Sequence, residues 1–402
     1  MDKEAMGREA GGRVTGERDA GKRGMKGREA GKRDARGREA IRKKAREQGT
    51  GGQEAGNNKA TEEKCLDRDI LHNTGASTAR QKRHGILFAI CAVSIVFLMA
   101  GTSNLLGQRE VIFPEVAAIC VGYFAAPKRP WAASKIWILA LISFSAVLGI
   151  FIVRFLPGPV WFQMLVAYGI CQVALPLSRT TFAPMISAMV LPVLLQTDTL
   201  IYPVSAIGFT ALLLGIVVIL EKAGLRKKEP YEPWPLPDRM ERFTIFYRVG
   251  IVALLLFILT NSGFTFAAAP PLLVAFTEFT KPEHPAAKRP FRSCILLFLS
   301  ASCGALVRFA VSMQLGLPTA FAAAITMAAI LVLMKFFSMY LPPCAALGLL
   351  AMLIPQEAVP LYPFEAGCGA AIYLVAALAW SKVRSTVALG NTETGLPSNY
   401  EE

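Results

Sequence analysis

Long apolar runs alternate with short polar connections from residue 85 to residue 381, whereas the preceding part of the chain is polar and charged. Most runs approach the ~20 apolar residues that a helix needs to cross a bilayer. They are too many to belong to one signal peptide. The pattern therefore predicts an all-α polytopic membrane protein with about twelve transmembrane helices. We expect them near residues 85–106, 110–126, 134–156, 160–177, 181–196, 200–220, 246–262, 264–280, 292–314, 317–336, 340–354 and 361–381.

The charge of the connections predicts how these helices are oriented. Lys and Arg gather on one set of connections, for example at Lys128-Arg129, in residues 221–248 and at Lys288-Arg289. The alternate connections are poor in both residues, and only Arg109 departs from this rule. Because positively charged loops stay on the cytoplasmic side, we expect both termini to be cytoplasmic and the protein to lie in the cell (cytoplasmic) membrane.

Short phrases recur between the two halves of the membrane region. The third expected spans contain Val153-Arg154-Phe155 and Val307-Arg308-Phe309, and the sixth contain Tyr202-Pro203 and Tyr362-Pro363. Because each half holds an even number of spans, the recurrence predicts two six-helix parallel repeats. The expected divisions are a tail at 1–83, a first repeat at 84–220, a cytoplasmic linker at 221–245, a second repeat at 246–381 and a cytoplasmic C-terminal tail at 382–402.

The N-terminal tail is a basic, low-complexity segment. Phrases such as Gly27-Arg28-Glu29-Ala30-Gly31-Lys32-Arg33 recur about every ten residues and hold almost nothing to bury, so we expect disorder. The Lys and Arg residues of this tail favour weak attraction to anionic lipid or nucleic acid, and the alternative is a solvated tail without a partner. Interleaved acidic residues and the lack of aromatic side chains argue against a specific nucleic-acid partner.

Four of the expected spans begin at proline followed by small or aliphatic residues. The run that starts at Pro342-Pro343-Cys344 is roughly 14 residues long, which is too short to cross a bilayer, so this helix is expected to begin inside the membrane. The other three follow Pro114, Pro184 and Pro270-Pro271. Buried helix starts of this kind attract anions through free N–H groups and the helix dipole, whereas ordinary span starts at the interface would not.

These prolines also indicate a weaker symmetry within each half. Spans two and five of a half both open with proline but start on opposite sides of the membrane. Spans one to three and four to six would then be inverted repeats, with their short helices meeting near the midplane. Independent use of proline at helix starts is the competing explanation.

The chain resembles the HPP family of integral membrane proteins. The similarity lies in the proline-rich connection Lys281–Pro290, in Gly304-Ala305, in Leu317-Pro318 and in Leu341-Pro342-Pro343-Cys344. Family members carry a His-Pro-Pro motif, and here Leu341 stands where the histidine would be. Some members are nitrite carriers, so the resemblance implies transport of a small anion.

Two arginines and two glutamates lie in or beside the apolar runs. Arg154 and Arg308 offer guanidinium groups that suit a small oxyanion, although both lie near a span end and snorkelling to the headgroups is the alternative. Glu115 and Glu365 open spans on the outer side and are candidates to carry a coupling proton or to pair with the arginines; interfacial carboxylates are the alternative. The expected substrate-binding residues are Arg154, Arg308, Pro114, Pro184, Pro270, Pro271, Pro342, Pro343 and Cys344.

The sequence therefore predicts a secondary transporter of a small, nitrite-like anion. The alternative is a non-transporting membrane scaffold or sensor that acts through its tail and linker. We expect no enzymatic activity, because the chain has no nucleotide-binding glycine loop or serine elbow. The scattered cysteines and the three histidines predict neither a metal site nor a cofactor. The expected partners are the lipid bilayer and the anion, and homo-oligomerisation is left open.

Overall fold

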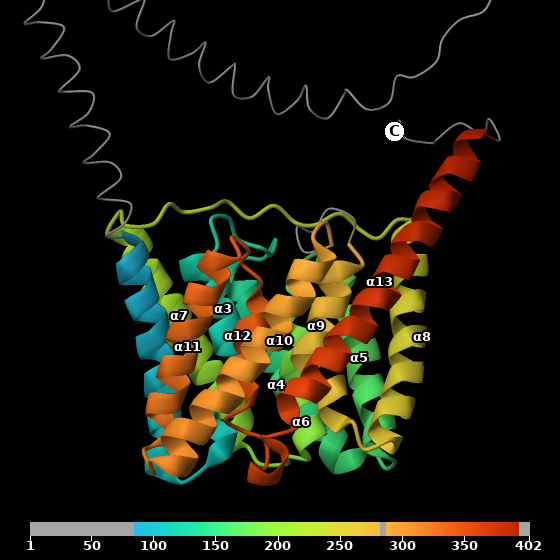
Figure 1. Ribbon diagram of the computed structural model, residues 1–402. Coiled ribbons are helices and arrows are strands. Elements are labelled where there is room, and N and C mark those ends of the chain that lie inside the picture. The colour runs from blue at the N-terminus through green and yellow to red at the C-terminus, as the bar shows by residue number, and fades with distance from the viewer. Residues whose placement is uncertain (1–83, 282–286, 394–402) are drawn as a thin grey trace, which may run out of the picture. The chain divides into compact units, whose positions relative to one another are not determined.

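The computed structural model describes the backbone of residues 84–281 and 287–393, and it describes side chains as far as residue 386 (Figure 1). The predicted N-terminal tail and residues 394–402 lie outside this range. The described part is helical and contains no strand. Eight of its helices are long and apolar enough to cross a membrane. They are His84–Leu106, α4 (Lys135–Phe155), α5 (Val160–Leu177), α7 (Ile201–Lys222), α8 (Arg239–Asn261), α10 (Pro290–Val307) with its π-helical continuation η4 (Arg308–Gln314), α11 (Thr319–Phe336) and α13 (Tyr362–Glu393).

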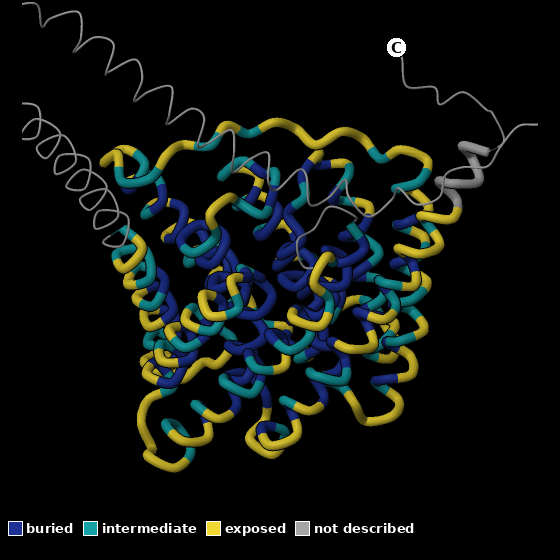
Figure 2. Tube along the Cα trace, turned by 45° about the horizontal axis from the view of Figure 1, so that its top comes forward, coloured by how far each residue is buried: buried dark blue, intermediate teal, exposed yellow. Residues whose placement is uncertain are grey.

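The surfaces of these helices indicate an integral membrane protein. Large apolar side chains are exposed around the bundle, including Leu105, Ile136 and Phe336, each more than four-fifths exposed. Buried residues gather in the interior (Figure 2). Exposed apolar surface on this scale is unfavourable in water but suits contact with lipid tails.

The other four predicted spans contain short helices instead of full-length ones. They are α3 (Glu115–Cys120), which continues as the π-helix η2 (Val121–Ala125), α6 (Pro184–Leu195), α9 (Pro270–Phe279) and α12 (Pro342–Leu350). Every residue of α9 and α12 is buried. With 6 to 12 residues, the four α-helical segments are too short to cross a bilayer. Within residues 84–281 and 287–393, the structure thus has eight long helices and four short ones in place of the twelve predicted spanning helices.

Glycine allows two of the short helices to lie close to long ones. A Cβ atom on Gly149 of α4 would come within 2.5 Å of the Met189 carbonyl oxygen of α6. A Cβ atom on Gly304 of α10 would come within 2.0 Å of the Gly348 carbonyl oxygen of α12. Membrane helices often approach in this way, because small residues bring the two backbones into contact.

The connection between α7 and α8 lies across one end of the bundle, here called the linker face (Figure 1). Arg129 holds it through its Nε, which donates to the Glu229 carboxylate at 2.9 Å, and its Nη2, which donates to the Glu229 carbonyl oxygen at 2.8 Å. Helix α8 begins at Arg239, seven residues before the predicted start, because Asp238 caps it by accepting a hydrogen bond from the Glu241 N–H at 2.6 Å. The opposite end, here called the pocket face, carries η1 (Arg109–Val111) and η5 (Gln356–Ala358).

Candidate functional site where four short helices meet

The first turns of the four short helices meet around one small space, here called the central void. Its volume is about 10 Å³, less than an anion occupies. Each helix contributes one residue from its start and the residue three positions later, which lie on the same helix face. The lining residues are Glu115 and Ala118 of α3, Pro184 and Ser187 of α6, Pro271 and Val274 of α9, and Pro343 and Ala346 of α12.

The helix starts give the central void a positive electrostatic environment. Each helix dipole places partial positive charge at its N-terminus, and four such ends converge here. Several first-turn amides already donate to a carbonyl three residues back, including those of Ala117, Ile186 and Cys344. Pro271 and Pro343 carry no N–H. The attraction for negative charge therefore comes from the aligned dipoles more than from the free N–H groups that the sequence led us to expect.

Glu115 places a carboxyl group at this point. Glu115 is 1% exposed, and its Oε1 accepts a hydrogen bond from the Ser187 hydroxyl of α6. Its other oxygen, Oε2, has no hydrogen-bond partner within the described part of the chain. A buried acceptor without a partner is costly, so the position of this group calls for a functional reason.

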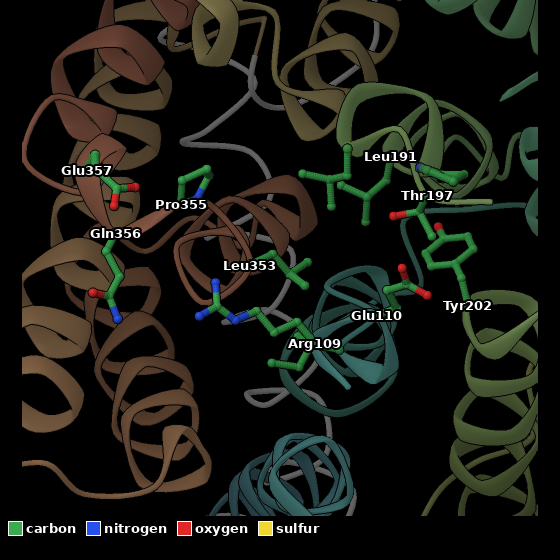
Figure 3. A pocket seen from close by; sticks show the side chains of 12 residues that line it. Arg109, Glu110, Leu191, Thr197, Tyr202, Leu353, Pro355, Gln356 and Glu357 are labelled. Atoms are coloured by element: carbon green, nitrogen blue, oxygen red, sulfur yellow. The ribbon is translucent and has the colours of Figure 1, made fainter. Parts of the chain in front are cut away.

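A larger pocket opens on the pocket face, with a volume of about 530 Å³. Its polar lining includes Arg109 and Glu110 of η1, Gln356 and Glu357 of η5, and Tyr202 of α7 (Figure 3). Leu191 of α6 also lines it and lies four residues after Ser187, a distance of about 6 Å along the helix axis. The pocket therefore reaches to within about one helical turn of the central void.

The two arginines that share a sequence phrase occupy different environments. Arg154 is exposed in the last turn of α4 and lines neither the void nor the pocket. Arg308 is 5% exposed, and its Nη1 donates to the carbonyl oxygens of Ala351 and Ile354, the latter at 2.7 Å. Since those carbonyls follow α12, Arg308 caps the C-terminal end of this helix. The structure does not bring the two arginines together at one site.

Of the other residues predicted for the site, most lie at the central void and one lies away from it. Pro184, Pro271 and Pro343 line the central void, and Pro114, Pro270 and Pro342 precede void-lining residues by one position. Cys344 follows Pro343 and is fully buried. Glu365 lies away from the void, where its Oε2 accepts a hydrogen bond from the Phe266 N–H at 2.8 Å.

A buried polar network near the linker face was not found from the sequence. Arg248 of α8 is 3% exposed; its Nε donates to the Thr280 hydroxyl at 2.7 Å, and its Nη1 donates to the Glu241 carboxylate at 3.2 Å. Burial, assisted by the Arg248 charge, lowers the pKa of nearby Lys281 to about 8. From the sequence, Arg248 was expected to be one of the charges in the basic connection 221–248. The helical start at Asp238 was the signal that would have placed it two to three turns inside α8.

No family model, curated protein or solved structure matches the chain. The candidate site is therefore defined by the four short helices and by the side chains at their meeting point.

Proposed function

We propose that this integral membrane protein is a secondary transporter of a small anion of nitrite-like size, with the central void as its substrate site. The observation that carries the proposal is the convergence of four proline-led helix starts on one buried point. Discontinuous helices whose positive ends face a site within the bilayer are a recurrent design of secondary transporters. The pocket on the pocket face supplies a route toward the site from one side.

Matching contacts support two parallel six-helix repeats around this site. The Tyr202 hydroxyl of α7 donates to the Ala188 carbonyl oxygen of α6 at 2.8 Å. The Tyr362 hydroxyl of α13 donates to the Leu347 carbonyl oxygen of α12 at 2.5 Å. The close contacts of Gly149 and Gly304 also join corresponding helices of the two halves. In this proposal each short helix counts as one span together with the extended segment that leads to it. The four short and the eight long helices then make twelve spans.

The size and charge of the Glu115 side chain support a small anion as substrate. Its carboxylate is a bent O–C–O group, similar in shape to the O–N–O of nitrite, and it lies at the four positive helix ends. The site thus accommodates a group of this kind within the chain itself. The resemblance to the HPP family, some of whose members carry nitrite, points to the same class of substrate.

The distribution of basic residues supports an orientation with the linker face in the cytoplasm. Lys128, Arg129, Arg226 and Lys227 lie at this end, whereas Arg109 is the single Lys or Arg in the described connections between helices at the pocket face. Under the positive-inside rule, both termini are cytoplasmic and the pocket opens away from the cytoplasm of a cell membrane.

Uptake by the purified full chain in lipid vesicles tests the function. Vesicles are offered nitrite, nitrate, formate and chloride in turn, and the anion inside is measured against protein-free vesicles. We expect accumulation or exchange of nitrite and of anions of similar size. If the protein transports none of the four anions, the proposal is refuted.

The alternative of a membrane scaffold or sensor is favoured by two observations. The central void is too small to hold an anion as it stands, and the linker is fixed in place by Arg129. A scaffold would remain closed under all conditions, so it would transport none of the four anions. The same uptake measurement therefore distinguishes the two functions.

A further inference from the structure

We propose that Glu115 couples each transported anion to one proton, so that an anion enters the central void only when the Glu115 carboxyl group is protonated and has turned out of it. This inference rests on the proposed function and adds the coupling ion and the stoichiometry. It makes the anion and the Glu115 carboxylate alternative occupants of one site.

The contacts of Glu115 give the first step of the argument. Its side chain is buried at the junction of α3 and α6, where Ser187 is its hydrogen-bond partner through Oε1 and where Oε2 is unpartnered in the described structure. The carboxylate therefore lies where the four helix dipoles favour negative charge. It occupies in charge and in shape the place that a small oxyanion would take.

Electrostatics gives the second step. Two negative charges in contact repel strongly in a protein interior, because the effective dielectric constant there is low. The anion and the ionised carboxylate therefore exclude each other. A proton that binds the carboxylate forms a neutral carboxylic acid, and rotation of this group out of the site releases the Ser187 hydroxyl to donate to the anion. One proton and one monovalent anion then cross together, without net movement of charge.

The elements packed against α3 leave Glu115 without a charged neighbour in the described residues. Helix α7 presents Tyr202, whose hydroxyl is bonded to Ala188, and its charged residues Glu221 and Lys222 lie at the far end of the helix. Helix α12 presents Cys344, and α6 carries no titratable side chain. The other titratable groups on this side are Cys120 and Tyr123 of α3 and η2, and Glu278 of α9 lies two turns beyond Pro271.

Proton movement measured together with anion uptake tests this inference. The full chain is reconstituted in vesicles that contain a pH-sensitive dye, and nitrate and nitrite gradients are applied, with protein-free vesicles as the blank. Nitrate is included because the uncharged acid of nitrite crosses bilayers unaided. We expect the interior to acidify by one proton per anion, and we expect the uptake rate to be insensitive to an imposed membrane potential.

Glu115→Gln is the informative variant, because glutamine resembles the protonated side chain but cannot release a proton. Any anion uptake that this variant shows is expected to proceed without acidification of the interior and to become sensitive to membrane potential. Glu365→Gln is the matched control, since Glu365 is also a buried glutamate but lies away from the void; it should acidify as the unmodified chain does. Glu115→Asp, which keeps a titratable group, should retain coupling even if glutamine impairs folding.

The outcomes separate this inference from the proposed function. Anion uptake by the unmodified chain without proton movement would overturn the coupling and leave the transporter function standing. Equal acidification per anion in the unmodified chain and in Glu115→Gln would also overturn it. Absence of anion uptake by the unmodified chain would instead refute the function itself.

Discussion

The Ser187 hydroxyl donates a hydrogen bond to the Glu115 carboxylate and so joins α6 to α3 at the point where both helices begin. The two residues come from sequence positions 72 apart, and both line the central void. This contact places a hydrogen-bonded carboxyl group among four positive helix ends.

The first prediction concerns this contact. Ser187→Ala leaves Oε1 buried without its donor, so we expect a loss of about 1–3 kcal/mol in stability. Ser143→Ala on α4 is the control, because that hydroxyl bonds only to the Leu139 carbonyl of its own helix, and it should change stability by less than about 0.5 kcal/mol. Thermal unfolding in detergent measures both. In a double-mutant cycle with Glu115→Gln, strictly additive effects would contradict a direct interaction.

The second prediction concerns the close approach of α10 and α12. Gly304→Ala forces a Cβ atom against the Gly348 carbonyl oxygen, and overpacking of this kind typically costs about 1–3 kcal/mol. Gly215→Ala on α7 meets no atom within 4 Å and is expected to be neutral or to stabilise by up to about 1 kcal/mol. The melting temperature of Gly304→Ala should therefore lie below that of the unmodified chain. The melting temperature of Gly215→Ala should be equal to that of the unmodified chain or higher. Equal values for the two would show that the glycine contact is unimportant.

The third prediction separates Arg308 from Arg154. Arg308→Gln removes the cationic donor to the Ala351 and Ile354 carbonyls, so we expect a loss of about 2–4 kcal/mol, and lysine should restore only part of it because it lacks the fork of donors. Arg154 is exposed, and Arg154→Gln should leave stability and uptake nearly unchanged. The measurements are unfolding temperature and nitrite uptake at matched protein levels. A large loss of uptake in Arg154→Gln would instead show that Arg154 is part of the substrate site.

The fourth prediction tests the orientation. Gln356 lines the pocket and Lys227 lies in the linker, and both are exposed at opposite ends of the bundle. Cysteine at Gln356 should react with an impermeant thiol reagent added outside intact cells, and cysteine at Lys227 should react only after the membrane is opened. The seven described native cysteines are buried or half-buried, and the unmodified chain serves as the blank. The reverse labelling pattern would invert the assigned orientation.

The hydrophobic pattern of the sequence located the helical segments well. This is because the length of an apolar run and the positions of prolines are local features of the sequence. It placed the start of α12 at the double proline and anticipated that this helix is short. It overestimated the length of α3 and α9, because apolar residues in extended or 3₁₀ segments such as η3 (Thr265–Ala268) look the same in a sequence as residues of a spanning helix.

The arrangement of the site was only partly accessible from the sequence. Proline at four helix starts indicated where a site would form. Glu115, which follows Pro114, was also named from the sequence as a candidate functional residue. The repeated phrase around Arg154 and Arg308 suggested equal roles, but local exposure and the carbonyls of Ala351 and Ile354 gave them different ones. The Ser187 partner depends on the packing of α6 against α3, which no local pattern records.

Nitrite uptake after the central void is filled tests whether anions pass through this void. Ala346 lines the void and Ala211 faces outward on α7, so Ala346→Val and Ala211→Val add the same two methyl groups in different places. We predict that Ala211→Val transports as the unmodified chain does, whereas Ala346→Val, at equal amounts of folded protein in vesicles, loses at least about 10-fold in uptake because the added volume occupies the anion site. Unchanged uptake by Ala346→Val would contradict the claim that anions pass through the meeting point of the four short helices.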